Sequence, residues 1–484
     1  MLMEKQEAYV IIDIGTGNVR VAVATLQGQI LGLARTDMNY VRDTLYPEAL
    51  YFDPNALWMK IQELSRTALA QAGDVRVLAM TTTSQREGIV LVSAGGESLI
   101  GLPNIDHRGR EWETDISNTD EIYALTGRYP TSLFSAMKMI GIRERRKDIW
   151  EQTAFFTSIS DWASYKLSGI PHYEHAQASE TLLYSIAHKT WSEQLCGYFD
   201  IDQAMLPELR NAGTVLGQIL PAAATAMGIN GDSLIIVGGA DTQFGVQSTQ
   251  PEPGDIVIVS GTTTPIVQLS TSYVTDLKQR LWTGRHIDAN SFIVEANAGV
   301  TGLNYQRLKE IFYPNESYQV IEQELAAIQH QQCVASLGSL LADEASPVIR
   351  GGFIFDTPVS HLLSRADFVW ATLWDIACSI RENYESLREV TGHHADYVWA
   401  CGGGIQSPVL RQFIANLLQK KLLIRESYMQ SSVSGGVFIC NQALGKMQPE
   451  AVTLEITYPE LLPEQDKRYT QWKETRQALK TTFN

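Results

Sequence analysis

Two segments far apart in the chain share one pattern, in which apolar runs flank a polar turn that contains glycine. The first runs from Ala8 to Ala24 (AYVIIDIGTGNVRVAVA), and the second runs from Gly254 to Leu269 (GDIVIVSGTTTPIVQL). Runs rich in valine and isoleucine on both sides of a tight glycine turn predict β-hairpins. Glycine lets backbone N–H groups point at an oxyanion, and threonine adds hydroxyl donors. We therefore expect a duplicated fold whose two hairpins hold a polyphosphate from opposite sides of a cleft.

The rest of the first half alternates between predicted strands and helices. The expected elements are strands at Val75–Thr81, Gly88–Val92, Trp150–Phe156 and Ser233–Val237, with helices at Met137–Ile142 and in the segment SISDWASYKLSG. Gly169 is expected to end the second of these helices. The stretch TQPEPGD, from Thr249 to Asp255, holds two prolines and no apolar residue. It predicts a boundary between a domain of residues 1–248 and a domain of residues 249–484.

The second half continues with the same alternation. Apolar residues from Val369 to Leu387 recur at helical spacing, and Asp396–Ala400 reads as a strand. Ser407 followed by Pro408 is a typical helix start. The pair Gly435–Gly436 is expected to open or interrupt the next helix. Hairpins followed by alternating strands and helices predict an α/β fold with a mixed sheet in each half.

Composition limits the class of protein. The chain has 484 residues, a formal net charge of −16 and five cysteines without CxxC spacing. Its length suits two domains, and its charge argues against nucleic acid or an acidic membrane as a partner. Scattered cysteines of odd number favour reduced thiols and a cytoplasmic location. The first apolar run, Val10 to Ile12, meets Asp13 at once, so we expect a buried strand and no membrane span.

The first hairpin turn carries groups suited to a metal-bound polyphosphate. Thr16 and the amides around Gly17 could contact phosphate, Arg20 adds a positive charge, and Asp13 could hold Mg²⁺ through water. The alternative is an ordinary hairpin in which these residues only satisfy turn geometry. The recurrence of the turn at Gly261–Thr264 favours the phosphate interpretation. No GxxxxGK[ST] sequence is present, which excludes a P-loop enzyme.

Two further glycine-rich segments follow predicted strands. Gly402–Gly404 precede the helix that starts at Ser407, so their backbone could approach a planar ring, unless they form only a tight turn. Asp241 follows a buried strand and two glycines. A carboxylate there points into the crevice where α/β folds bind ligands, and it could take a proton from an attacking hydroxyl. The alternative for Asp241 is the N-cap of the next helix.

Charged residues gather in two loops of the first half. Arg86 and Glu87 sit at a strand end, where an arginine can donate to hydroxyl oxygens while a glutamate accepts from hydroxyls. Asp106 and Arg108 are expected at the same edge. A surface ion pair is the alternative for the first two residues. His107 has no second ligand at metal spacing, so a hydrogen-bonded histidine is the expected state.

These motifs, taken in order, resemble the FGGY carbohydrate kinases. The motifs are DIGTGNVR, SQREG, NIDHR, FSAMK, ISDWASYKLSG, VGGADTQFG, SGTTT and CGGGIQSPVLRQFIANLL, and together they extend over Ala8 to Gly445. The resemblance implies two ribonuclease-H-like (actin-like ATPase) domains with a nucleotide cleft between them. It also implies ATP and Mg²⁺ as cofactors, and transfer of a phosphoryl group to a hydroxyl of a sugar, ketose or polyol.

The resemblance assigns roles by position. Asp241 matches the catalytic aspartate, which also contacts the substrate, and Arg86, Glu87 and Asp106 fall on the substrate side. Matches to nucleotide-binding motifs are Thr16, Gly17, Arg20, Gly261, Thr262, Gly302, Gly403, Gly404 and Ser407, with Asp13 on the metal. Within the family the QREG and NIDHR segments look most like autoinducer-2 kinases, and more distantly like glycerol kinases and xylulokinases.

Two departures bear on the substrate. Asn104 and Leu133 stand where glycerol kinases place a tryptophan and a tyrosine, which should disfavour a three-carbon triol and suit a more oxygenated molecule. The segment RGGFIFDTPVSH also departs from the family's Gly-Glu-Arg-x-Pro pattern. The predicted partner is a small sugar or polyol, and a homodimer is the one assembly considered. The alternatives are an actin- or chaperone-like ATPase, a nucleotide-gated binding protein, or a kinase relative without activity.

Overall fold

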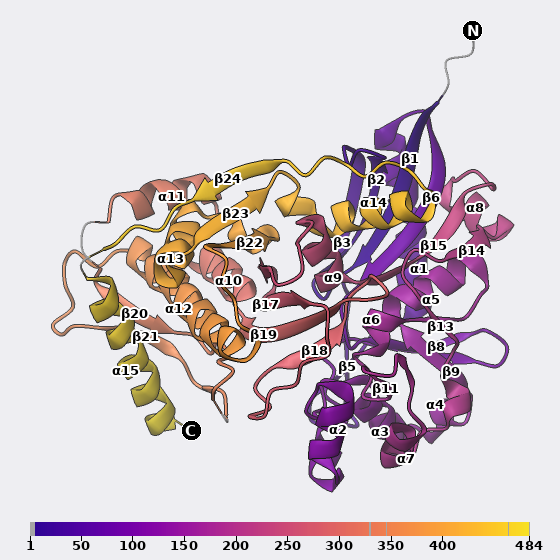
Figure 1. Ribbon diagram of the computed structural model, residues 1–484, viewed down its shortest axis with the longest axis horizontal. Helices are drawn as coiled ribbons and strands as arrows, with labels where there is room; N and C mark the ends of the chain where they lie inside the picture. Colours follow the sequence, from indigo (N-terminus) through magenta and orange to yellow (C-terminus); the bar gives the residue numbers. More distant parts are fainter. Residues whose placement is uncertain (1–4, 329–330, 345, 463, 484) are drawn as a thin grey trace.

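Two large mixed sheets, one from each half of the chain, form the framework of the protein (Figure 1). The computed structural model describes residues 5–328, 331–344, 346–462 and 464–483. In Figure 1 the first half, in indigo to magenta, lies to the right, and most of the second half, in orange to yellow, lies to the left. Each half therefore has its own sheet and its own core.

The first sheet has six strands in the order β14-β15-β6-β1-β2-β3. Its strands are β1 (Gln6–Ile14), β2 (Asn18–Thr25), β3 (Ile30–Asp37), β6 (Val75–Ser84), β14 (Val215–Gln218) and β15 (Leu234–Ala240). Strand β2 is antiparallel to both β1 and β3, whereas β6 is parallel to β1 and to β15. A Cβ on Gly238 would lie 1.7 Å from the carbonyl oxygen of Thr82, so only glycine lets β15 approach β6 here.

The second sheet has seven strands in the order β18-β19-β17-β16-β22-β23-β24. Its strands are β16 (Ile256–Val259), β17 (Thr263–Ser270), β18 (Trp282–Arg285), β19 (Phe292–Val300), β22 (Tyr397–Cys401), β23 (Lys421–Arg425) and β24 (Thr453–Thr457). Strand β16 pairs antiparallel with β17 and parallel with β22, and β17 pairs antiparallel with β19. This repeats the β1–β2–β3 and β6–β15 arrangement. The predicted fold class, two ribonuclease-H-like domains, is confirmed.

The helices cover both sheets. The helices of seven residues or more are α1 (Pro54–Ala72), α2 (Thr119–Thr126), α3 (Ser135–Arg145), α5 (Ile159–Ser168), α7 (Glu193–Phe199), α8 (Pro221–Met227), α9 (Asp241–Ser248), α10 (Gly302–Phe312), α11 (Tyr318–Ala326), α12 (Arg365–Thr391), α13 (Pro408–Leu418), α14 (Ser431–Ala443) and α15 (Gln465–Phe483). A smaller sheet joins β7 (Ile89–Ser93), β8 (Ser98–Leu102) and β9 (Thr153–Ser158). Gly169, with a φ of 76°, ends α5 as expected.

Helices α9 and α14 cross between the two sheets. Helix α14 belongs to the second half but packs on β1, β6 and α9, and Figure 1 shows it in yellow beside the violet strands. Phe244 of α9 packs toward the first sheet, whereas Val246 packs against Val257 and Cys401 of the second. Residues 249–255, the predicted domain boundary, connect α9 to β16.

The pair Gly435–Gly436 lies inside α14, so the expectation that it opens or interrupts this helix is wrong. A Cβ on Gly435 would lie 2.4 Å from the carbonyl oxygen of Phe244, and one on Gly436 would lie 2.8 Å from the side chain of Ile11. The two glycines therefore serve close packing against α9 and the first sheet. The glycine pair has a structural role, but that role is close packing of the helix and not its start or interruption.

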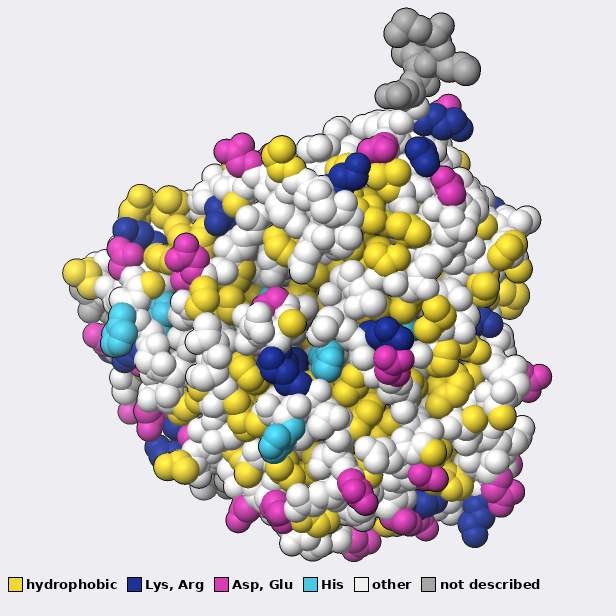
Figure 2. Space-filling model, turned by 45° about the vertical axis from the view of Figure 1, so that its right-hand side comes forward, with side chains coloured by type: hydrophobic (Ala, Val, Ile, Leu, Met, Phe, Trp, Pro, Cys, Tyr) yellow, Lys and Arg dark blue, Asp and Glu magenta, His cyan; other side chains and the backbone are white. Residues whose placement is uncertain are grey.

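The face drawn in Figure 2 shows no large surface patch of one charge. Acidic and basic side chains lie there in small groups among apolar ones. Within the part of the chain that the structure describes, no helix has the length and apolar character needed to span a bilayer.

Candidate active site

The first hairpin turn lies between β1 and β2 and is held by contacts from other elements. Asp13 and Arg20 stand opposite each other in the hairpin, and the Arg20 guanidinium donates to the Asp13 carboxylate. Ser432, at the start of α14, donates to the same carboxylate at 2.6 Å. The hydroxyl of Thr16 donates to the side-chain oxygen of Asn104 at 3.1 Å. Three of the predicted residues, Asp13, Thr16 and Arg20, are therefore brought together with Gly17 at one sheet end.

The second hairpin turn lies between β16 and β17, and glycines from two other segments pack against it. A Cβ on Gly302 would lie 2.1 Å from the carbonyl oxygen of Gly261. The amide of Gly404 donates to the carbonyl of Ser260 at 2.8 Å. The carbonyl of Thr262 accepts from the amide of Leu303, next to Gly302, at 3.3 Å. The structure thus brings Gly261, Thr262, Gly302 and Gly404 together.

The loop after β22 completes this arrangement. A Cβ on Gly402 would lie 2.3 Å from the carbonyl oxygen of Ser260, and its φ is 96°. A Cβ on Gly403 would make only an ordinary contact, 3.7 Å from the side chain of Gln406. Ser407 is the N-cap of α13, and its buried hydroxyl accepts from the amide of Leu410 at 3.3 Å. The predicted helix start is confirmed, and the hydroxyl of Ser407 is engaged in holding it.

A chain of contacts links the two turns across the molecule. The amide of Gly402 donates to the carbonyl of Tyr428 at 2.8 Å. Two residues further on, the side chain of Gln430 accepts from Arg20 at 3.4 Å. The segment between β23 and α14 therefore contacts the glycine loop of the second half and the Asp13 turn of the first. Both hairpins belong to one interface between the sheets.

Asp241 lies where β15 ends and α9 begins. It is the first residue of α9, and Ala240 occupies the N-cap position. Its carboxylate accepts from the amide of Thr242 at 2.7 Å. Burial raises the pKa of Asp241 to about 6, the negative charge of Asp13 adds to this rise, and Arg86 opposes it. Both the turn of the first hairpin and the Arg86 cluster therefore act on this carboxylate.

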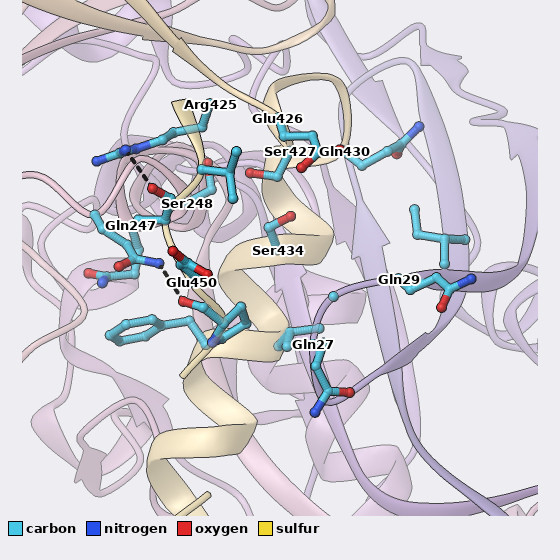
Figure 3. Close-up of a pocket in the computed structure, with 18 of the residues that line it drawn as sticks. Gln27, Gln29, Gln247, Ser248, Arg425, Glu426, Ser427, Gln430, Ser434 and Glu450 are labelled. Atoms are coloured by element: carbon cyan, nitrogen blue, oxygen red, sulfur yellow. Dashed lines mark hydrogen bonds between the residues drawn. The ribbon is translucent and has the colours of Figure 1, made fainter. Parts of the chain in front are cut away.

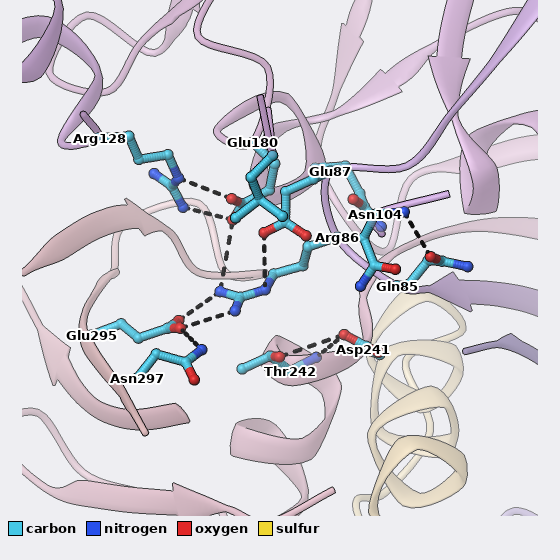
Figure 4. A network of polar contacts seen from close by, with 12 residues as sticks. Gln85, Arg86, Glu87, Asn104, Arg128, Glu180, Asp241, Thr242, Glu295 and Asn297 are labelled. Atoms are coloured by element: carbon cyan, nitrogen blue, oxygen red, sulfur yellow. Dashed lines mark hydrogen bonds and ion pairs between the residues drawn. The ribbon is translucent and has the colours of Figure 1, made fainter. Parts of the chain in front are cut away.

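Arg86 lies in a cluster of buried charges, shown in Figure 4. Its two terminal nitrogens donate to the two carboxylate oxygens of Glu295, at 2.5 and 2.9 Å. Glu87 lies 3.8 Å and Glu180 lies 3.9 Å from the same guanidinium. Burial raises the pKa of Glu87 to about 8. The alternative of a surface ion pair is excluded, because Arg86 is only 7% exposed.

Asp106 differs from Arg86 and Glu87 in what it contacts. Its side chain is fully buried, and its oxygens accept from Arg108 at 2.7 Å and from the amide of Leu50 at 2.9 Å. Direct contact between Asp106 and a substrate stays a prediction. Its hydrogen bonds indicate that Asp106 holds the neighbouring loop in place. His107 contacts the hydroxyl of Ser132 at 3.1 Å, as expected of a hydrogen-bonded histidine.

Among the described residues, no group of three histidine, cysteine, aspartate or glutamate side chains is placed to hold a metal ion. Asp13 is a single carboxylate, buried to 2% exposure. Such a donor fits Mg²⁺, which keeps several waters and is usually shared with substrate phosphates. The residues present are therefore compatible with a magnesium ion that binds together with the nucleotide phosphates.

A cavity of about 520 Å³ lies between residues of the first and second halves, beside α14. It is lined by the β2–β3 turn, the C-terminal end of α9, residues 425–430 and residues 449–452 (Figure 3). None of the predicted catalytic, substrate-binding, nucleotide-binding or metal-binding residues lines it. The volume suits a small molecule, but the site's chemistry lies at the hairpins and the Arg86 cluster.

Several residues of the cluster escaped the sequence analysis. Glu295 and Asn297 lie on β19, Glu180 follows α6 (His175–Ala178), and Ser432 is the second residue of α14. A glutamate inside the apolar run FIVEANAGV was a usable signal, because strand interiors rarely bury an unpaired charge. Glu180 and Ser432 offered no such signal.

The fold defines a class, the actin-like ATPase fold built from two related domains. Residues 8–247 match the N-terminal domain of the FGGY family of carbohydrate kinases, and residues 334–444 match its C-terminal domain. The chain belongs to this family of carbohydrate kinases, as the motifs predicted.

Relatives agree with this assignment. The chain is 47% identical over 476 residues to YoaC of Bacillus subtilis (strain 168), whose name places it among sugar kinases, and 98% of each chain is covered. It is 26% identical over 324 residues to autoinducer-2 kinase of Escherichia coli (strain K12), which covers 65% of this chain and 61% of that one.

Solved structures share the fold. Ligand-bound xylulose kinase from Lactobacillus acidophilus has a TM-score of 0.85 at 17% identity, covering 99% of this chain and 100% of that chain. Plasmodium falciparum glycerol kinase with ADP has a TM-score of 0.82 at 18% identity, covering 99% of both. As a kinase of this family, the protein uses ATP and acts on a small sugar-like molecule.

Proposed function

We propose that this protein transfers the γ-phosphoryl group of ATP to a hydroxyl of an uncharged sugar, ketose or polyol, with Asp241 as the general base. The observation that carries the proposal is the position of Asp241. The charges of Asp13 in the first hairpin and of Arg86 both act on its pKa, and Figure 4 shows its carboxylate near the Arg86 cluster. A base in this position can reach a hydroxyl held at Arg86 while that hydroxyl faces the phosphates.

The nucleotide is held by the two hairpins. Thr16, Gly17 and Arg20 act on the phosphates from the first sheet, and Gly261 and Thr262 act from the second. Gly302, Gly403 and Gly404 form the wall on the nucleoside side, where Ser407 holds the start of α13. Magnesium, when bound with the phosphates and Asp13 through water, would neutralise charge that develops during transfer.

The reaction follows from these positions. Asp241 accepts the proton of the acceptor hydroxyl as its oxygen forms a bond to the γ-phosphorus. The bond from that phosphorus to the bridging oxygen breaks, and ADP leaves with its electron pair. Because the transition state is loose, charge neutralisation and positioning account for most of the rate gain, and the base adds about 10²–10⁴-fold.

Domain movement is part of the proposal. The predicted domains, residues 1–248 and 249–484, each contribute one hairpin, and Arg86 and Glu295 pair across them. Closure of such a cleft excludes water and limits the transfer of phosphate to water.

A coupled assay of ADP formation tests the proposal. Three- to seven-carbon polyols and ketoses, and the autoinducer-2 precursor, serve as acceptors with MgATP. ADP formation that requires an acceptor supports the proposal. ADP formation at the same rate without any acceptor favours an actin- or chaperone-like ATPase instead, and nucleotide binding with no turnover indicates an inactive relative.

A further inference from the structure

The guanidinium of Arg86 already has its charge neutralised before any substrate enters. Glu295 makes two hydrogen bonds to it at 2.5 and 2.9 Å, and the glutamate is only 2% exposed. Arginine carries five N–H donors, so three remain for other acceptors. Arg86 can therefore still donate to hydroxyl oxygens, but it no longer offers an unbalanced positive charge.

The neighbouring buried cations also have partners within the protein. Arg128 donates to both oxygens of Glu180, at 2.6 and 2.8 Å. Arg108 pairs with Asp106 at 2.7 Å. Lys138 donates to backbone carbonyls, and burial lowers its pKa to about 8. Arg108 and Arg128 are therefore each neutralised by a carboxylate, whereas Lys138 is held by carbonyl oxygens.

An acceptor with a carboxylate would be disfavoured at this place. Within a buried region of low dielectric, two like charges a few ångströms apart repel strongly, and an unpaired charge also loses its hydration. A hydroxyl group avoids both costs, since it can accept from Arg86 and donate to the carboxylates. The cluster thus favours hydroxyl-rich, uncharged acceptors.

We propose that Glu295 is the specificity-determining residue that restricts this kinase to uncharged polyols and sugars and excludes sugar acids. The inference rests on the proposed function, because it names the substrate class of the same cleft. Glu295 acts through Arg86 and is a positioning residue. It belongs to β19 of the second half, whereas Arg86 follows β6 of the first, so the selection is made across the interface.

The glutamate is itself fixed in place. The side-chain amide of Asn297 donates to Glu295 at 2.9 Å, while the oxygen of Asn297 accepts from the amide of Gly299 at 2.8 Å. This second layer of hydrogen bonds orients the carboxylate toward Arg86 (Figure 4). Because its orientation is fixed, the Glu295 carboxylate cannot rotate away from Arg86 to let the carboxylate of an acceptor bind there.

The test compares matched pairs of acceptors that differ only at one carbon, such as D-glucitol with D-gluconate, and the shorter polyols with their aldonates. In wild type, the neutral member of each pair is expected to have the higher kcat/KM. In Glu295→Gln, the ratio of kcat/KM for the neutral member to that for the acid should fall by about tenfold or more, mainly through KM of the acid. Glu295→Asp keeps the charge and should keep the preference.

Controls separate this inference from folding and from the proposed function. Glu324→Gln breaks a surface pair with Arg365 and should leave the ratio unchanged. Equal use of both members by wild type, or an unchanged ratio in folded Glu295→Gln, would overturn the inference. If Glu295→Gln does not fold, the wild-type comparison decides. If no acceptor is phosphorylated, the proposed function fails, and calorimetry with MgADP still tests whether only neutral members bind.

Discussion

The pKa of Asp241 is raised to about 6 by burial and, next in size, by the negative charge of Asp13. The two carboxylates come from separate elements, the start of α9 and the end of β1, that meet at one end of the first sheet. Asp13 accepts from Arg20 and Ser432, while Asp241 accepts from Thr242 and, among the described residues, from no other group. Their environments suit different tasks, with Asp13 near phosphate and Asp241 available to accept a proton.

This pair predicts the pH dependence of catalysis. Asp241 must be ionised to act as a base, so acceptor-dependent kcat/KM should rise with pH and level off above a pH of about 6. Below that value, activity should fall by about tenfold per pH unit. Initial rates between pH 5 and 9 at saturating MgATP measure the profile. A flat profile across this range would show that Asp241 does not accept the proton.

Gly302 is predicted to be required for nucleotide binding. The Cβ of Gly302→Ala would come within 2.1 Å of the Gly261 carbonyl oxygen, so the second hairpin turn must shift. We expect KM for ATP to rise by about tenfold or more, which corresponds to an overpacking cost of roughly 1–3 kcal/mol. Gly197→Ala is the matched control, because a Cβ there meets nothing within 4 Å. Equal KM values in the two variants would separate this glycine from the nucleotide site.

Glu174 is predicted to make stability depend on pH. Burial raises its pKa from 4.5 to about 8, so its protonated form stabilises the fold below pH 4.5, and this stabilisation is lost as pH rises through 8. Glu174→Gln removes the charge and keeps an oxygen that can accept from the amide of Gln177, as Glu174 does at 3.0 Å. The variant should exceed wild type in unfolding free energy by roughly 2–4 kcal/mol at pH 8, and match it near pH 4.5.

Thermal melts of Glu174→Gln and wild type at pH 5 and pH 8 test whether the variant becomes the more stable protein as pH rises. Exposed Glu474 provides the control substitution, Glu474→Gln, whose Tm should follow wild type at both pH values. A variant that is less stable than wild type at pH 8 would contradict the assigned direction.

Gly435→Ala tests the packing of α14 on α9. The new Cβ would lie 2.4 Å from the carbonyl oxygen and 2.8 Å from the Cα of Phe244, so one helix must move. We expect a loss of about 1–3 kcal/mol in unfolding free energy, seen as a lower Tm. Gly231→Ala adds a Cβ that meets nothing within 4 Å and should leave Tm close to wild type.

The sequence predicted those parts of the site that are encoded locally. Both hairpins, the strand before Asp241 and the helix start at Ser407 follow from short patterns of apolar residues, glycine and capping residues. The bidentate partner of Arg86 did not follow from any such pattern, because Glu295 lies 209 positions away and meets it only when the two sheets face each other.

The glycines also show which features local sequence patterns can and cannot predict. At Gly402 and Gly169 a positive φ explains the residue, and local reasoning placed both correctly at turns. At Gly435 the reason is the carbonyl of Phe244 on another helix. Sequence alone does not distinguish a glycine that ends a helix from one that lets a second helix approach.

The most direct measurement of the central claim compares Asp241→Asn with wild type in one assay that follows ADP and phosphorylated acceptor together. The account predicts that wild type forms both in equal amounts, and that Asp241→Asn still binds MgATP but loses roughly 10²–10⁴-fold in acceptor-dependent turnover. Turnover equal to wild type in Asp241→Asn, or ADP formed by wild type without phosphorylated acceptor, would contradict it.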